Sequence, residues 1–565
     1  MTATSGRPWL SSYAPDVPAD VTVPDGSLVD LLQRSAERFG PAVALDFYGA
    51  RTTFTDLLDR VDRAAAALAG LGVRVGDRVA LVLPNCPQHV VAFYAVLRLG
   101  AVVVEHNPLY TAAELEQQLA DHGARVVVAW DKAAPAVLAS QPRTAVETVV
   151  SVDLTTALPR VKRLALRLPL ARSRATRAAM TAPAPATTGW DRLVAAARPL
   201  PASHPRPGGD DVALLQYTGG TTGAPKGAVL THRNLLANAT QGRAWVPGLR
   251  DGQETVYAVL PLFHAYGLTL CLTFAVSIGA TLVLFPRFDA DQVLDAVGRR
   301  APTFLPAVPP VYAALARRAR ERGVDLTSVR YGISGAMALP PAVVTDWEQV
   351  SGGLLVEGYG MTETSPITLG NPVSAARRPG TVGVPFPSTE IRIVDPEDTS
   401  RDRAQGEPGE LLVRGPQVFS GYWGRDAETA AVLLPDGWLR TGDVVVMSDD
   451  GFVTVVDRIK ELIITGGFNV YPSEVEDALR RVPGVADAAV VGLPTDDGGE
   501  QVVAAVVAEA GAELDPEQVR SAGREHLAGY KVPRRVVVVD ELPRSVIGKV
   551  LRRQVREELL SRPAG

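Results

Sequence analysis

Cysteine is almost absent from this chain. Only Cys86 and Cys271 occur among 565 residues. Two cysteines so far apart form neither a disulfide framework nor a metal-binding spacing, so buried thiols are the expected state. A reducing compartment, the cytoplasm, fits this usage.

An excess of one charge sign is also absent. Lys plus Arg total 57 and Asp plus Glu total 62, which gives a formal net charge of −5. This balance gives no argument for nucleic-acid binding, and we expect no nucleic-acid partner. Since 565 residues are too many for one hydrophobic core, several domains or subdomains are expected.

Long hydrophobic runs are limited to one segment, and the N-terminal residues do not resemble a secretory signal peptide. Residues 256–286 contain no Lys, Arg, Asp or Glu, but Pro261, His264, Gly267 and Gly279 interrupt them. A membrane-spanning helix needs about 20 continuous apolar residues. The segment therefore predicts a buried unit in which two strands flank a helix.

Helical and strand patterns alternate through the first part of the chain. Residues 77–84 and 101–108 are short and apolar, and residues 87–100 between them have a helical pattern. A strand–helix–strand unit of this kind predicts a right-handed parallel crossover. The predicted fold class is α/β, with parallel-rich sheets covered on both faces.

The pattern changes twice toward the C-terminus. Strands and turns predict a β-rich subdomain over about residues 380–457. A helix–strand–strand–helix–strand pattern then predicts a compact α+β unit, in residues 473–485, 486–494, 500–509, 515–527 and 534–543. We place the N-terminal domain at residues 1–457, a hinge at 458–460 and a C-terminal domain at 461–565.

Residues 154–180 contain cations but no acidic residue. The cations are Arg160, Lys162, Arg163, Arg167, Arg172, Arg174 and Arg177. Leucines are interleaved with them, and Pro169 limits any single helix. Two interpretations stay open: a solvated basic linker or surface helix, and a patch over residues 160–177 that contacts an anionic membrane surface from its inner side.

The segment YTGGTTGAPKGAVLTH, residues 217–232, is rich in glycine and threonine. Glycines allow positive φ and close backbone approach, so successive N–H groups can form an anion-binding nest. A plain glycine-rich turn is the alternative. The segment is not a Walker loop, in which Ser or Thr follows Gly-Lys, because Lys226 stands between Pro225 and Gly227.

Six motifs in this order resemble signatures of the adenylate-forming superfamily of acyl-CoA synthetases, luciferases and adenylation domains. They are residues 217–232, LPLFHAYGL at 260–268, EGYGMTETSP at 357–366, DGWLRTGD at 436–443, VDRIKELIITGGFNVYPSEVE at 456–476 and LPRSVIGKVLRR at 542–553. They extend from residue 217 to residue 553. Within the superfamily the sequence resembles bacterial long-chain fatty acyl-CoA synthetases most.

The resemblance implies a large N-terminal domain of several subdomains and a small mobile C-terminal domain. It also implies a two-step ligase. A fatty-acid carboxylate attacks the α-phosphate of ATP to give acyl-AMP and pyrophosphate, and the CoA thiol then displaces AMP. Because the carboxylate is itself the nucleophile, the site supplies charge compensation and alignment, with Mg²⁺ as the implied metal.

The resemblance also assigns residues to nucleotide binding. The phosphate loop comprises Thr218, Gly219, Gly220, Thr221, Thr222, Gly223 and Lys226, with Lys226 on the outgoing pyrophosphate. Adenine and the α-phosphate are assigned to Gly335, Ala336, Gly358, Tyr359, Gly360, Met361 and Thr362. Glu363, with Thr218, is the implied Mg²⁺ site, since a carboxylate suits this hard cation.

Four further residues have implied roles. Asp443, at the end of an apolar segment, is expected to accept hydrogen bonds from the ribose hydroxyls with help from Arg458; an ion pair between the two is the alternative. Lys549 is expected to contact the carboxylate and α-phosphate during adenylation, although alone it would be taken for an exposed tail lysine. His264 is either a gate of the acyl or pantetheine channel or a core histidine.

One domain arrangement cannot serve both steps, so the C-terminal domain is expected to rotate about Lys460. The pantetheine channel is then assigned to Gly466, Gly467 and Phe468. Two other enzymes stay open: an acyl-AMP ligase that loads a carrier protein, and an aryl- or coumarate-type CoA ligase. A non-catalytic nucleotide-binding scaffold would show degraded motifs. Acyl chain length is not readable from one sequence, and a homodimer is one alternative for the oligomeric state.

Overall fold

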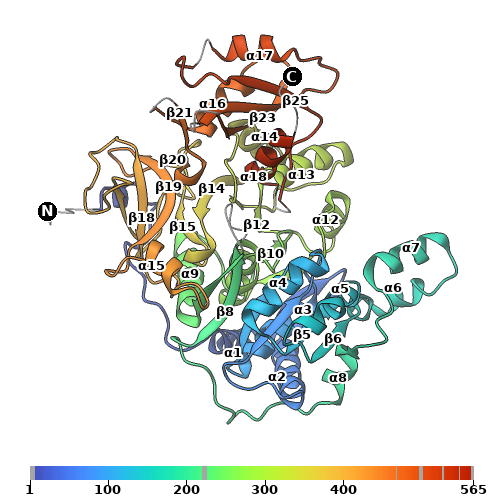
Figure 1. Cartoon of the computed structure of the whole chain (residues 1–565). Coiled ribbons are helices and arrows are strands. Elements are labelled where there is room, and N and C mark those ends of the chain that lie inside the picture. Colours follow the sequence, from blue (N-terminus) through green and yellow to red (C-terminus); the bar gives the residue numbers. More distant parts are fainter. Residues whose placement is uncertain are drawn as a thin grey trace.

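Two large sheets packed with helices form most of the protein (Figure 1). A four-stranded sheet lies beside them, and a smaller unit contains the C-terminal strands. The predicted α/β class is therefore confirmed. The computed structural model describes residues 7–218, 225–465, 468–495, 500–524, 527–545 and 548–561.

The first large sheet has the order β7-β6-β5-β3-β4-β8-β9, and its neighbouring strands are parallel except for β8 and β9. Its strands are β3 (Arg78–Val82), β4 (Val102–Glu105), β5 (Val126–Trp130), β6 (Thr148–Val152), β7 (Thr188–Gly189), β8 (Val212–Thr218) and β9 (Lys226–Thr231). Along β3, Val79 and Leu81 pack into one core, and Ala80 and Val82 into another. Both faces are buried, which explains the continuous apolar run.

The second large sheet has the order β16-β15-β14-β13-β12-β10-β11-β1-β2, with parallel strands from β14 to β1 and antiparallel edges. Its strands are β1 (Val43–Phe47), β2 (Ala50–Thr53), β10 (Thr255–Ala258), β11 (Thr281–Leu284), β12 (Phe304–Ala307), β13 (Tyr331–Ser334), β14 (Leu354–Gly360), β15 (Ile367–Gly370) and β16 (Val384–Pro385). The apolar segment around residues 256–286 forms β10 and β11 with a buried helical connection, as predicted.

Helices lie between the two sheets and on their outer faces. Between them are α1 (Leu28–Phe39), α2 (Phe54–Gly70), α3 (Pro87–Arg98), α9 (His232–Trp245), α10 (Ala265–Gly267), a π-helical segment (Leu268–Thr273) and α11 (Phe274–Ser277). The outer helices are α4 (Ala112–His122), α5 (Ala134–Ser140), α12 (Ala290–Val297), α13 (Pro309–Arg322) and α14 (Pro341–Ser351). The Thr231 side chain accepts from Asn234 N–H and so starts α9 directly after β9.

The four-stranded sheet is antiparallel and lies within the predicted β-rich region. Its strands are β17 (Glu390–Val394), β18 (Gly409–Arg414), β19 (Leu439–Met447) and β20 (Val453–Arg458), with α15 (Asp426–Val432) between β18 and β19. Because β19 continues through Gly442 and pairs Asp443 with Arg458, Asp443 lies inside a strand. The expectation that it ends an apolar segment was wrong.

The C-terminal unit has cores on both faces of one small sheet, whose strands are β23 (Val485–Pro494), β24 (Glu500–Ala508) and β25 (Arg535–Val539). Helices α16 (Pro472–Arg480) and α17 (Pro516–Gly523) cover one face. The predicted element order is confirmed. Sequence analysis did not predict α18 (Arg552–Ser561), which covers the other face, or the hairpin β21 (Ile463–Thr465) and β22 (Phe468–Val470).

The basic segment forms α6 (Arg160–Ala165) and α7 (Ala171–Met180), which project from the body beside α5 (Figure 1). The break between them includes Pro169, as expected. In the part of the chain that the structure describes, no helix combines the length and the apolar character needed to cross a membrane.

Candidate active site

A cavity of about 1180 Å³ lies where both large sheets, the four-stranded sheet and the C-terminal unit come together. It brings together these predicted site residues: Thr218, Lys226, His264, Gly335, Ala336, Gly358, Tyr359, Gly360, Met361, Thr362, Glu363, Arg458, Lys460 and Lys549. Phe468 begins β22. The described residues do not include Gly219, Gly220, Thr221, Thr222, Gly223, Gly466 and Gly467.

The two ends of the glycine-rich segment face each other across a pair of antiparallel strands. Thr218 at the end of β8 pairs in register with Lys226 at the start of β9, and Thr218 Oγ1 donates to Lys226 O at 3.4 Å. The segment therefore joins strand to strand, whereas a Walker loop joins strand to helix. Lys226 Nζ lies 5.2 Å from the centroid of the Tyr422 ring, a cation–π contact.

Glu363 is 7% exposed and lies in a 3₁₀ turn directly after β14. The Tyr422 hydroxyl donates to Glu363 Oε1 at 2.6 Å. Burial and the Glu363 carboxylate raise the pKa of Tyr422, so its hydroxyl stays a donor. One phenol uses one acceptor position of the carboxylate, and the others fit a hard cation such as Mg²⁺. Sequence analysis missed Tyr422, which lies in the short aromatic stretch Tyr422–Trp423.

Asp443 is 3% exposed and is held by two partners. The Tyr359 hydroxyl donates to Asp443 Oδ2 at 2.5 Å, and Arg458 Nε lies 2.9 Å from Asp443 Oδ1. The Asp443–Arg458 ion pair that sequence analysis gave as an alternative is therefore present. Tyr359 and Arg458 line the cavity, whereas Asp443 itself is not among the lining residues.

Lys549 reaches the same cavity from the C-terminal unit, so it is not an exposed tail residue. Burial and the nearby Arg458 charge lower the pKa of Lys549 to about 8, while Asp443 acts in the opposite direction. The backbone turn before it is closed by Ser545, whose N–H donates to Lys549 O at 2.8 Å and whose Oγ accepts from Lys549 N at 3.2 Å. A cation on this turn faces the Asp443–Arg458 pair.

Burial disfavours the charged form of two titratable side chains at the cavity wall. Burial lowers the pKa of His264 to about 4, and its Nδ1 accepts from Tyr266 N–H at 3.3 Å. Burial raises the pKa of Glu357 to about 8 against the opposing hydrogen bond from Leu339 N–H. Burial at this wall therefore favours the uncharged form of both groups. Sequence analysis gave Glu357 no role.

An apolar arm of the cavity is lined by Gly242, Trp245, Leu270, Phe274, Phe304 and Phe386. Trp245 stacks on Phe386 with ring centroids 4.5 Å apart, and Phe274 lies 4.8 Å from Phe304. A side chain at Gly242 would fit without a clash, because an added Cβ would lie 3.6 Å from Phe274, an ordinary contact distance. The arm can hold an apolar chain. Its residues come from separate elements and carry no common sequence signal.

Known proteins resemble this chain in sequence and in fold. The family described as AMP-binding enzyme matches residues 32–423, and its C-terminal domain matches residues 474–549. The long-chain-fatty-acid–CoA ligase of Bacillus subtilis (strain 168) is 40% identical over 557 residues, which cover 98% of each chain. Feruloyl-CoA synthase of Amycolatopsis sp is 37% identical over 524 residues, with 93% of this chain and 97% of that chain covered. ATP-bound MatB from Rhodopseudomonas palustris superposes with a TM-score of 0.81 at 30% identity, with 94% of this chain and 99% of that chain covered.

Proposed function

The chain belongs to the AMP-binding enzyme family, and from this premise we propose that it is an ATP-dependent fatty acid–CoA ligase. A fatty-acid carboxylate reacts with ATP to give acyl-AMP and pyrophosphate, and CoA then gives acyl-CoA and AMP. One observation carries the proposal: a single cavity joins lysines and a buried carboxylate to an apolar arm. A phosphate chain and an acyl chain can therefore meet in it.

In the first step a carboxylate oxygen forms a bond to the α-phosphorus, and the bond to the bridging oxygen breaks. Pyrophosphate leaves with the electron pair. Lys549 and Thr362 compensate charge at the α-phosphate, and Lys226 compensates the departing pyrophosphate. This step needs no protein nucleophile, because the residues hold the two reactants in line.

The remaining polar groups of the site position the nucleotide. Asp443 accepts from the ribose hydroxyls, and Arg458 and Tyr359 fix the carboxylate in place. The segments Ser334–Ala336 and Glu357–Gly360 line the adenine side. Glu363 and Thr218 would hold Mg²⁺, which when bound neutralises phosphate charge.

In the second step the CoA sulfur attacks the acyl carbonyl carbon, and the bond from that carbon to the AMP oxygen breaks. Lys549 occupies the cavity that CoA has to approach, so we propose that the C-terminal unit rotates about Lys460 between the steps. The rotated arrangement would place residues 466–468 along the pantetheine path, with His264 at its inner gate.

The test is to incubate the protein with ATP, Mg²⁺ and palmitate, with and without CoA. We expect palmitate-dependent pyrophosphate release and CoA-dependent palmitoyl-CoA. Accumulation of palmitoyl-AMP without CoA consumption would favour a carrier-protein acceptor instead. A parallel series of fatty acids of increasing length, with coumarate and ferulate as aryl competitors, measures the substrate class. Preference for an aryl acid would contradict the fatty-acid proposal.

We also propose that residues 160–177 contact an anionic membrane surface from the cytoplasmic side. Val161, Leu164, Leu168 and Leu170 are between 50% and 78% exposed, and the cations of this segment are interleaved with them in the sequence. Apolar side chains flanked by cations match the interface of an anionic bilayer.

The test is co-sedimentation with phosphatidylglycerol vesicles at low salt. Changing the arginines of residues 160–177 to glutamine should reduce binding, with phosphatidylcholine vesicles as the matched control. Unchanged sedimentation would support the solvated linker. The homodimer stays a prediction that sedimentation equilibrium can check.

A further inference from the structure

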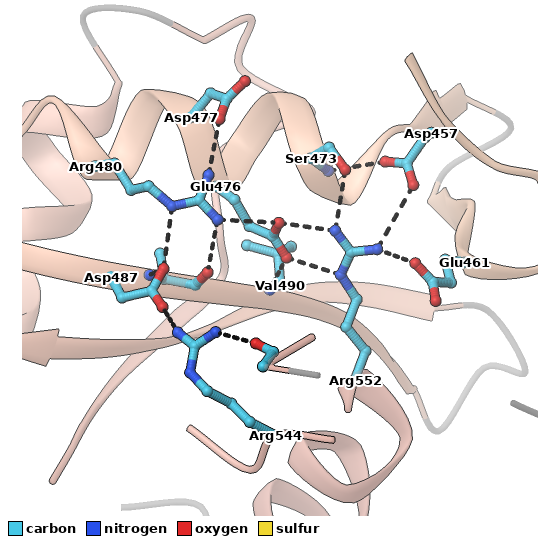
Figure 2. A network of polar contacts seen from close by, with 12 residues as sticks. Asp457, Glu461, Ser473, Glu476, Asp477, Arg480, Asp487, Val490, Arg544 and Arg552 are labelled. Atoms are coloured by element: carbon cyan, nitrogen blue, oxygen red, sulfur yellow. Dashed lines mark hydrogen bonds and ion pairs between the residues drawn. The ribbon is translucent and has the colours of Figure 1, made fainter. Parts of the chain in front are cut away.

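Two arginines flank the turn that carries Lys549: Arg544 precedes it and Arg552 follows it. Figure 2 shows the polar contacts of both arginines. On the N-terminal side, Arg544 Nη1 donates to Gly548 O at 2.7 Å, and its other nitrogen pairs with Asp487 on β23. Arg544 and Val550 also form an antiparallel bridge across the turn. The carbonyl next to Lys549 is therefore fixed to the C-terminal sheet.

On the C-terminal side, Arg552 begins α18 and pairs with Glu476 of α16 through two hydrogen bonds. Arg552 Nε lies 2.8 Å from Glu476 Oε1, and Nη2 lies 2.7 Å from Oε2. Nη2 also donates to Ser473 Oγ at 3.0 Å. A two-point pair with a buried carboxylate fixes the direction of the guanidinium, which a lysine ammonium cannot do.

The two anchors belong to one network (Figure 2). Arg480 lies 3.5 Å from Glu476 and 3.1 Å from Asp487, so it joins the carboxylates that hold Arg552 and Arg544. The Glu476 side chain is 6% exposed and also accepts from Val490 N–H at 2.9 Å. Both sides of the Lys549 turn are thus tied to α16 and β23.

Arg552 also touches both sides of the proposed hinge. It pairs with Glu461, just after residues 458–460, and its Nη1 lies 3.7 Å from Asp457 Oδ1, just before them. Asp457 Oδ2 accepts from Ser473 N–H at 2.8 Å. A rotation at residues 458–460 would carry Arg552 and Ser473 away from Asp457 together. The Asp457 contacts therefore belong to the arrangement that places Lys549 in the cavity.

We propose that Arg552 is a positioning residue for adenylation: it fixes the Lys549 turn on α16 and secures that unit to Asp457 across the hinge. The inference rests on the proposed two-step function. Asp457 is 1% exposed in its side chain and Glu461 13%. Glu461 holds the guanidinium within the C-terminal unit, and closing that unit brings the same guanidinium to Asp457 across the hinge.

The test compares Arg552→Lys with Arg520→Lys. Arg520 belongs to the same unit, but it lies on the surface of α17, outside the cavity lining, and pairs along that helix with Glu517 at 2.8 Å. Adenylation is measured as palmitate-dependent ATP–pyrophosphate exchange, and the second step as palmitoyl-CoA formation from supplied palmitoyl-AMP. For Arg552→Lys we expect about a 10-fold lower kcat for exchange with the ATP KM within about twofold, since misplacing a reacting group slows chemistry. Palmitoyl-CoA formation should stay within about twofold, as should both rates of Arg520→Lys.

A second variant separates positioning from folding. Asp457→Asn removes the charge before the hinge and keeps the shape of the side chain, and we expect slower exchange with palmitoyl-CoA formation unchanged or faster. Equal losses in both steps, or no loss in either variant, would overturn the inference alone. Absence of palmitate-dependent exchange in the unmodified protein would overturn the proposed function and this inference with it.

Discussion

Two lysines reach one cavity from scaffolds of different kinds. Lys226 begins β9 within a seven-stranded sheet, is paired in register with Thr218, and lies over the Tyr422 ring. Lys549 lies on a turn of the C-terminal unit, which has its own cores and is anchored by arginine–carboxylate pairs. Lys226 is thus a fixed charge of the binding surface, whereas the position of Lys549 depends on how the C-terminal unit is placed.

The largest expected effect comes from removing the charge on the C-terminal unit. Lys549→Ala should lower the rate of palmitoyl-AMP formation about 10²- to 10³-fold, because the cation that compensates the α-phosphate is lost. Palmitoyl-CoA formation from supplied palmitoyl-AMP should stay within about twofold of the unmodified protein. Single-turnover assays of each half-reaction measure both rates. Equal losses would contradict the idea that Lys549 serves one step.

Removing the fixed charge should have a smaller effect of a different type. Lys226→Ala is expected to lower kcat/KM for ATP about 30-fold, mostly through a higher KM, since a charge present in both ground and transition states contributes uniform binding. Initial rates of pyrophosphate exchange across an ATP series measure this split. If Lys226→Ala lowered kcat as much as Lys549→Ala, the two lysines would have the same role.

The two lysines also differ in how far their surroundings can be predicted from the sequence. The apolar runs that form β3, β4 and the α3 crossover were predicted, because burial on both faces leaves a continuous hydrophobic pattern. The anion-binding nest was also inferred from a local pattern, the glycines and threonines of residues 217–232, and it stays a prediction. The place of Lys549 beside Asp443 came only from the resemblance, since no local pattern joins two positions so far apart.

The partners of the site residues could not be predicted from the sequence for the same reason. Tyr422 and Glu363 are 59 positions apart, and Arg552 and Glu476 are 76 apart. Each is an ordinary residue in its own segment, and only the folded chain brings the pair together. Asp443 was expected to contact the ribose, but it is bonded to two cavity-lining residues and does not itself line the cavity. Its local structure was also wrongly expected, because its strand is defined by pairing with β20 and not by its own polar neighbours.

A pH profile gives a third, weaker comparison. The pKa of Lys549 is lowered to about 8, so the lysine is charged below this value and loses its proton above it. Adenylation kcat/KM, which reports the free enzyme, should therefore fall about 10-fold by about pH 9. In Lys549→Arg the decline should disappear, because a guanidinium stays charged. A decline of the same size in both proteins would assign it to another group.

The smallest expected effect comes from changing Tyr422, the aromatic side chain that contacts Lys226. Tyr422→Phe keeps the ring beneath Lys226 but removes the hydroxyl that donates to Glu363. Glu363 is the proposed Mg²⁺ ligand, and a ligand without its orienting partner binds less well. We therefore expect the Mg²⁺ concentration for half-maximal adenylation to rise about fivefold. The ATP KM at saturating Mg²⁺ should not change, whereas Tyr422→Leu should raise it as well, because the cation–π contact is also lost. An unchanged Mg²⁺ requirement in Tyr422→Phe would mean that Glu363 is oriented without the hydroxyl. The Lys226 side of the cavity would then be held in place by the sheet alone. This would increase its difference from the Lys549 side, whose position depends on the C-terminal unit.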